Sequence, residues 1–181
     1  MGKVNYSTVI HAPKEKVWQV LWGPTTYPVW TEPFSSGSRV ETDWEEGSRV
    51  LFLNSENEGM VSRIAKKDDN EFMSFEHLGM VDKNGKEDLE SEKVKSWAGS
   101  KEDYRLQEVD GKTELLVELD LDDSHEDFFG DTFPRALQRV KELSEDKFVS
   151  ENLIFENHEN LEFTIDHVYA VFISGKESSS P

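Results

Sequence analysis

The chain has 181 residues, no cysteine, and 38 acidic side chains against 20 basic ones, which gives a formal net charge of −18. This length suits one domain, with or without an appendage, that buries a core without covalent or metal cross-links. The lack of cysteine excludes disulfides, thiolate metal sites and thiol nucleophiles. Because phosphates would be repelled, the acidity argues against nucleic acid and anionic membrane surfaces as partners.

The N-terminal part predicts a strand followed by two helices. Residues 3–11 alternate between β-forming and polar side chains, as a half-buried strand does. Pro13 suits the start of a helix over residues 14–22, which Gly23-Pro24 ends, and residues 25–30 follow as a second short helix. No apolar leader and no run long enough to span a membrane is present, so we expect a cytoplasmic protein without a membrane span.

The middle of the chain predicts an antiparallel meander of strands joined by turns. Asp110-Gly111 is a strong hairpin turn, whereas residues 82–95 read as a charged loop that is either plain solvated surface or a surface for a basic partner. The predicted strands are residues 38–42, 49–54, 59–66, 71–81, 97–109 and 112–121.

A change of period to 3.6 residues then predicts a long amphipathic helix. Its apolar stripe runs from Phe129 through Phe133 and Leu137 to Leu143. Pro134 leaves two interpretations: Asp131 caps a new helix with Pro134 in its first turn, which we prefer, or one long helix bends there. Residues 1–147 therefore form the expected domain. We expect residues 148–181 to be a partly ordered or disordered extension, whose β-pattern over 161–173 either adds a strand or stays unfolded.

These elements predict an α+β fold in which a curved antiparallel sheet wraps around the long helix. Large rings between sheet and helix either enclose a ligand cavity or merely fill the core, since both use the same residue types. His77, Glu102 or Tyr104 would supply a polar contact, although His77 also suits an ordinary core position. The candidate ligand-binding residues are Trp30, Phe52, Phe75, His77, Trp97, Glu102, Tyr104, Phe129, Phe133 and Leu137.

The sequence offers no catalytic signature. It lacks a G-x-S-x-G elbow, a thiol and a phosphate-cradling glycine loop. The acidic residues 120–131 resemble a calcium loop, but His125 stands at the sixth position and Asp131 at the twelfth, where glycine and glutamate belong. We therefore predict no catalytic residue, no metal and no cofactor, and interpret this segment as a solvated turn before a helix.

The order and spacing of several motifs resemble the START-like, or helix-grip, superfamily, and within it the branch named after homologue 1 of the activator of the ninety-kDa heat-shock protein ATPase. The matching pieces are Ile10-His11-Ala12-Pro13, Val17-Trp18, Trp30, Gly47, residues 59–61, 71–75, 111–115 and 133–141.

The resemblance covers about residues 3–147. It implies the fold, but it carries no catalytic residues over. Such proteins bind lipids, hormones or polyketides, act as cyclases or dehydratases, or assist a chaperone. Our first hypothesis is therefore binding of an apolar or amphipathic small molecule. The alternatives are a protein-interaction or chaperone-assisting module and a cyclase- or hydrolase-like enzyme.

Overall fold

The computed structural model of the protein describes residues 2–146. Across this range eight strands pair in one sheet, and every pairing is antiparallel. The strands are β1 (Gly2–Ile10), β2 (Arg39–Glu41), β3 (Arg49–Leu53), β4 (Gly59–Asp68), β5 (Phe72–Val81), β6 (Glu87–Asp88), β7 (Lys101–Val109) and β8 (Lys112–Leu121). The helices are α1 (Lys14–Trp22), α2 (Tyr27–Thr31), α3 (Glu92–Lys95) and α4 (Glu126–Glu145).

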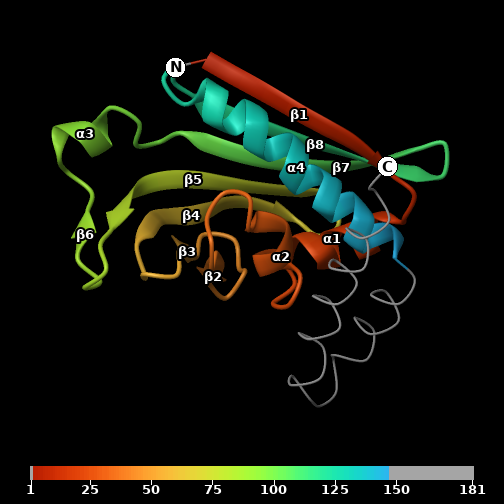
Figure 1. The fold of residues 1–181 in the computed structure, drawn as a ribbon, viewed down its shortest axis with the longest axis horizontal. Coiled ribbons are helices and arrows are strands. Elements are labelled where there is room, and N and C mark those ends of the chain that lie inside the picture. The colour runs from red at the N-terminus through yellow and green to blue at the C-terminus, as the bar shows by residue number, and fades with distance from the viewer. Residues whose placement is uncertain (1, 147–181) are drawn as a thin grey trace, which may run out of the picture.

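The sheet has the order β1-β8-β7-β5-β4-β3-β2, with β6 paired to one end of β5. The chain therefore begins at one edge, crosses to the opposite edge through α1 and α2, and returns strand by strand. α4 lies across one face of the sheet, as Figure 1 shows. The predicted α+β helix-grip architecture, a curved antiparallel sheet with a long C-terminal helix, is confirmed.

Local sequence signals account for most of these elements. Pro13 lies directly before α1, and its carbonyl accepts the first helical N–H groups. Asp110 and Gly111 have φ angles of 51° and 74° between the paired residues Val109 and Lys112, which is the backbone that a two-residue hairpin needs. The predicted hairpin is thereby confirmed.

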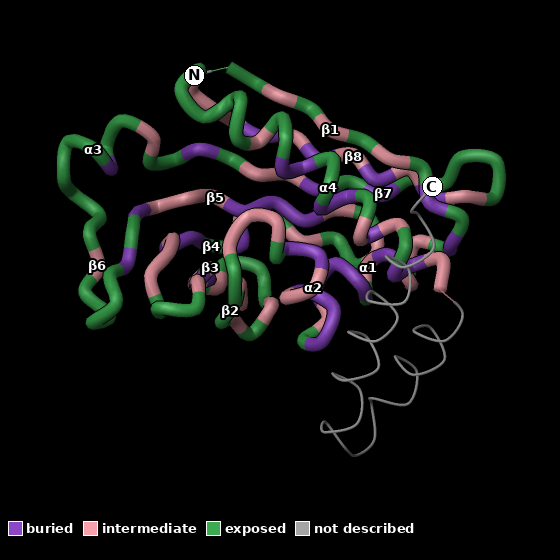
Figure 2. The backbone as a smooth tube through the Cα atoms, in the orientation of Figure 1, coloured by how far each residue is buried: buried purple, intermediate pink, exposed green. Residues whose placement is uncertain are grey.

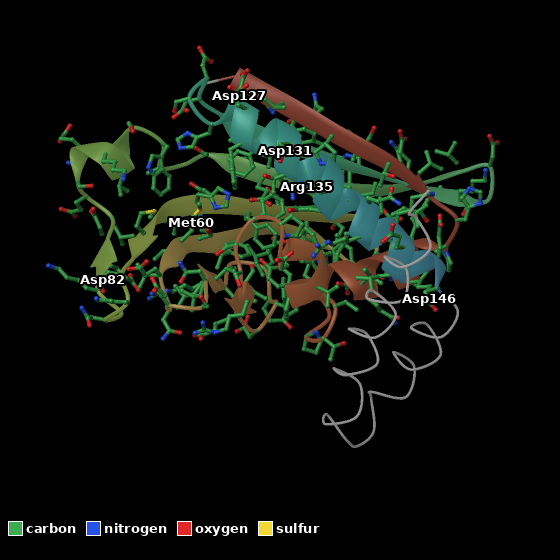
Figure 3. All side chains as sticks on the ribbon, in the orientation of Figure 1. Met60, Asp82, Asp127, Asp131, Arg135 and Asp146 are labelled. Atoms are coloured by element: carbon green, nitrogen blue, oxygen red, sulfur yellow. The ribbon has the colours of Figure 1, made fainter. Side chains whose placement is uncertain are left out.

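The core fills the space between α4, α1 and the inner face of the sheet. α4 turns Phe133, Leu137 and Val140 inward, and β8 meets them with Leu115 and Val117, all of them buried. Figure 2 shows this buried stripe along α4 and the alternation of buried and exposed residues on the strands. The opposite side of α4 is charged, with Asp127, Asp131 and Arg135 along it and Asp146 at its end (Figure 3).

The structure corrects three sequence predictions. α4 is one continuous helix from Glu126 with Pro134 inside it, so the preferred interpretation of a new helix capped by Asp131 is wrong. Residues 97–100 are not strand, because Ser91 caps the short helix α3 by accepting the Val94 N–H and the chain then turns through Gly99 at φ 90°. The charged segment 82–95 contains both α3 and β6. The strand or helix patterns predicted beyond residue 147 lie outside the described residues.

Candidate functional site

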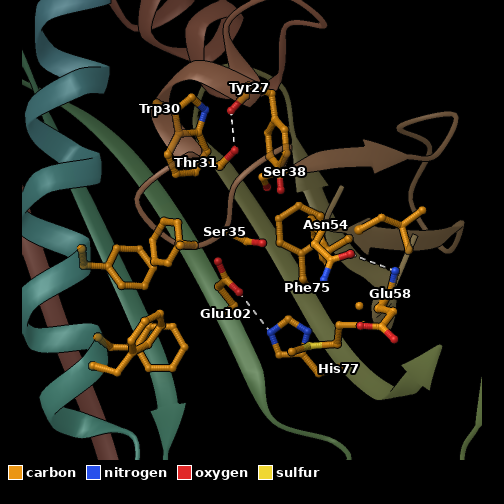
Figure 4. Close-up of a pocket in the computed structure, with 18 of the residues that line it drawn as sticks. Tyr27, Trp30, Thr31, Ser35, Ser38, Asn54, Glu58, Phe75, His77 and Glu102 are labelled. Atoms are coloured by element: carbon orange, nitrogen blue, oxygen red, sulfur yellow. Dashed lines mark hydrogen bonds and ion pairs between the residues drawn. The ribbon is translucent and has the colours of Figure 1, made fainter. Parts of the chain in front are cut away.

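A pocket of about 320 Å³ lies between the inner face of the sheet and the N-terminal half of α4. The long helix supplies Phe128, Phe129 and Phe133, while α2 and the loop after it supply further rings and hydroxyls. Figure 4 shows the pocket with Trp30, Phe75, His77 and Glu102 around it. The complete lining is Trp22, Tyr27, Trp30, Thr31, Phe34, Ser35, Ser38, Phe52, Leu53, Asn54, Glu58, Gly59, Met60, Phe75, His77, Met80, Glu102, Tyr104, Phe128, Phe129 and Phe133.

Strand register explains how an acid reaches this mostly aromatic space. Phe75 on β5 pairs with Glu102 on β7, which pairs with Leu119 on β8, which pairs with Val4 on β1. Residues opposite one another in antiparallel strands share a face. Glu102 is therefore the acidic member of an otherwise apolar cross-strand row on the inner face.

Four polar side chains from three neighbouring strands form a hydrogen-bonded chain at the pocket. The Ser62 Oγ lies 2.7 Å from His77 Nδ1, and His77 Nε2 lies 3.0 Å from Glu102 Oε2. The Tyr104 hydroxyl donates to the other oxygen, Glu102 Oε1. A neutral His77 that donates from Nε2 and accepts from Ser62 at Nδ1 satisfies every one of these contacts. The chain thus holds Glu102 in place from both sides.

Two buried tyrosines of the pocket lining, Tyr27 and Tyr104, stay protonated. Burial raises the pKa of Tyr104 well above its usual value, and the charge of Glu102 and the hydrogen bond to it act in the same direction. Burial also raises the pKa of Tyr27, again with a contribution from Glu102. Both hydroxyls therefore stay protonated at neutral pH, and that of Tyr104 donates to Glu102.

The structure brings most of the predicted site residues together. Trp30, Phe52, Phe75, His77, Glu102, Tyr104, Phe129 and Phe133 all line the pocket. Two do not. Leu137 is 3% exposed and packs in the filled core one helical turn beyond Phe133. Trp97 lies in the turn that follows α3, since the strand on which it was predicted begins only at Lys101. Ligand binding by these residues stays a prediction.

Sequence reasoning missed Ser62, the fully buried partner of His77. A register shift between Val61 and Ser62 leaves both of these consecutive residues buried, whereas simple alternation would expose one of them. Nothing in the local sequence marks that bulge. Tyr27 and Phe34 were also missed, although a short helix over 25–30 was predicted and its aromatic content was a usable signal.

The geometry limits the chemistry that the site can perform. The order Ser62–His77–Glu102 matches a nucleophile, base and acid, but Ser62 has no exposed surface and does not line the pocket. Its hydroxyl is behind His77 and out of reach of a ligand. Within residues 2–146, His, Asp and Glu nowhere gather in a group of three that could hold a metal ion. In the same part of the chain, no helix has the length and apolar character needed to cross a bilayer.

Comparison with known proteins identifies the fold. No family model matches the sequence, and a search of curated proteins finds no match to it. Among solved structures, the Aha1 dimer from Colwellia psychrerythraea is similar with a TM-score of 0.60 and 17% identity over 80% of this chain and 97% of that one. ChR145 from Cytophaga hutchinsonii is 21% identical with a TM-score of 0.59, over 82% of this chain and 97% of that one.

A third similar structure is DynU16, a protein of the dynemicin biosynthetic locus, with a TM-score of 0.58 and 12% identity over 78% of this chain and 46% of that one. At such identities the likeness establishes a shared fold. It agrees with the helix-grip resemblance read from the sequence.

Proposed function

We propose that the protein binds a compact apolar or amphipathic small molecule in the pocket between the sheet and α4. The observation that supports this most is the lining itself, in which aromatic rings surround a fixed set of polar groups. Ligand sites in proteins combine these same features, and about 320 Å³ lies at the lower end of their usual volume range. The ligand is therefore small, with an apolar body and one polar end.

The polar end has a defined place in this proposal. Glu102 and His77 line the pocket with side chains that are 22% and 12% exposed, so a ligand can reach them. Ser62 and Tyr104 hold these two groups in position from behind and beside. The rings on the α4 side would contact the apolar body of the ligand. Binding there removes apolar surface of both the rings and the ligand from water, which is favourable.

Thermal unfolding in the presence of phenylalkyl compounds with neutral, cationic and anionic head groups tests this proposal. A ligand at a hundred times its Kd stabilises the folded state by about 2.7 kcal/mol, which raises Tm by about 5–10 °C for a domain of this size. Ser35→Trp, which places a large ring into the lining, should abolish the shift. Ser36→Trp, at the exposed neighbouring position outside the lining, should leave it intact. The proposal fails if no compound raises Tm or if both variants respond like the wild type.

A second candidate function is a protein-interaction role of the chaperone-assisting kind. The fold likeness to Aha1 over nearly its full length favours it, as does the strongly acidic chain, which suits a basic surface on a partner. Stimulation of a heat-shock protein ATPase by the full chain would support this role. Stimulation that Ser35→Trp leaves unchanged would separate it from pocket binding, whereas absence of both association and stimulation would exclude it.

A further inference from the structure

We infer that the pocket selects an organic cation, a compact molecule with a protonated amine or quaternary ammonium head on an apolar body. This inference rests on the proposed function and specifies its ligand class. Its starting point is the charge of the wall. Among the described lining residues, Glu58 and Glu102 carry carboxylates, and neither lysine nor arginine is present. An anionic head group would meet two like charges there, and His77 in the same wall is already engaged by Glu102.

Glu102 has the geometry of a receptor for such a head group. Each of its oxygens accepts one hydrogen bond, from His77 Nε2 on one side and from the Tyr104 hydroxyl on the other. A carboxylate oxygen has two acceptor positions, so one remains on each oxygen for an N–H donor of a ligand. The two existing bonds also fix the direction in which the carboxylate points, which reduces the ordering that binding requires.

The hydrogen-bonded chain contains one acidic group. When His77 accepts the Ser62 hydroxyl at Nδ1 and donates from Nε2, the carboxylate of Glu102 is the charged group among the four side chains Ser62, His77, Glu102 and Tyr104. That charge lies in a wall of low polarity, where an ion pair with a ligand is less screened than in water.

The surrounding rings favour a cation as well. Tyr104 lies at the centre of a cluster, with ring centroids 4.9 Å from Trp22, 6.3 Å from Trp30 and 6.3 Å from Phe75. Every one of these rings lines the pocket. Aromatic faces carry partial negative charge and attract ammonium groups, and quaternary ammonium ligands are bound in such cages.

The cations near the pocket wall do not cancel this effect. Arg39 donates to the Asn54 carbonyl in the wall, but it also pairs with Glu41 at 3.0 Å. Arg139 contacts the Val29 carbonyl on α2 and pairs with Glu32 at 2.9 Å. The chain as a whole carries −18, so its field concentrates cations and depletes anions around the molecule.

Three ligands with one apolar body and different head groups test the inference: 4-phenylbutylamine, 4-phenylbutanol and 4-phenylbutyrate. Their Kd values are measured on the full chain at neutral pH by calorimetry, with Trp22 and Trp30 in the wall as fluorescent reporters. A charge-assisted hydrogen bond contributes enough for a preference of about tenfold or more. We therefore expect the amine to bind at least about tenfold more tightly than the alcohol, and the acid to bind most weakly.

Glu102→Gln is the decisive variant because glutamine keeps the shape and removes the charge. Its amide can donate to His77 Nε2 while its oxygen accepts from Tyr104, and His77 can then donate from Nδ1 to Ser62, so the chain of hydrogen bonds is conserved. Glu108→Gln removes an equal charge from an exposed position on the same strand, outside this pocket. The preference for the amine should vanish in Glu102→Gln and persist in Glu108→Gln.

Each outcome has a definite meaning. Amine binding that is no tighter than alcohol or acid binding, or a preference that survives Glu102→Gln, overturns the cation inference while pocket binding itself stands. Binding of none of the three compounds overturns the inference together with the proposed function. Thermal unfolding of Glu102→Gln without ligand confirms that the variant is folded.

Discussion

Phe133 joins the long helix to both the sheet and the pocket, so its truncation measures how firmly α4 is held. The ring is 2% exposed, stacks on Tyr6 with centroids 4.9 Å apart at 9°, and meets the edge of Phe34 at 4.8 Å. Phe→Ala substitutions in cores cost about 3–5 kcal/mol, and aromatic pairs contribute about 0.5–1.5 kcal/mol beyond buried area. Phe133 borders the pocket, which offers no atoms to fill the void that alanine would leave. We therefore expect Phe133→Ala to lower the free energy of unfolding by about 4 kcal/mol.

Urea unfolding followed by circular dichroism gives the free energy of unfolding for this comparison. Phe128→Ala is the matched control, since Phe128 lies on the same helix and lines the same pocket but is 51% exposed. It should cost less than about 1 kcal/mol. If Phe133→Ala unfolds the domain outright, Phe133→Leu should still fold and lose about 1–2 kcal/mol. A loss below about 1.5 kcal/mol for Phe133→Ala, or equal losses at both positions, would refute the packing of α4 described here.

Three further predictions concern backbone fit, alkaline stability and the extension. Gly59→Ala should lower the free energy of unfolding, measured in urea, by at least about 2 kcal/mol because the new Cβ would overlap the Phe52 carbonyl. Gly130→Ala within α4 places its Cβ in open space and should raise the free energy of unfolding by about 0.5–1 kcal/mol. The opposite ranking would contradict the backbone geometry. Burial raises the pKa of Tyr27 and of Tyr104 in the folded state above the unfolded value of about 10. Their contribution to the free energy of unfolding is complete below about pH 10 and is lost as pH rises above it, by up to about 1.4 kcal/mol per pH unit for each group. Tyr27→Phe should make the fall of stability with pH less steep, and an unchanged slope would argue against the burial of Tyr27. We also propose that residues 1–147 are a complete folding unit, because the described core clusters lie within them. A chain that ends at residue 147 should keep its Tm within a few degrees of the full chain. A large drop in Tm would assign residues 148–181 a share of the fold.

The parts of the fold that were predictable from sequence are those that local patterns determine. Alternation along residues 3–11 and 112–121 and the Asp110-Gly111 turn each depend on neighbours in sequence, and the structure has all of them. The stripe on α4 was equally clear. Pro134 was misjudged because helix interiors usually exclude proline, whereas here packing of Phe133 before it and Leu137 after it accompanies a continuous helix.

The site was harder to predict because it depends on register between strands distant in sequence. His77, Glu102 and Tyr104 were each identified as a polar contact, yet nothing local indicated that they bond to one another. Their meeting requires β5 and β7 to pair with Phe75 opposite Glu102, and the position of Ser62 requires a bulge in β4. Trp97 was misplaced for a related reason, since the cap at Ser91 and the turn at Gly99 override a pattern that reads as strand.

The four linked side chains are difficult to explain as structural elements alone. Glu102 interrupts a row that Phe75, Leu119 and Val4 would otherwise make continuously apolar, and a carboxylate in such a row costs desolvation that a leucine would avoid. The Tyr104 hydroxyl and His77 offset this cost, and Ser62 in turn satisfies His77. Glu102 thus accounts for the polar groups around it. An acid that is held from two sides, reachable from the pocket and surrounded by rings is the feature on which the proposed cationic ligand rests.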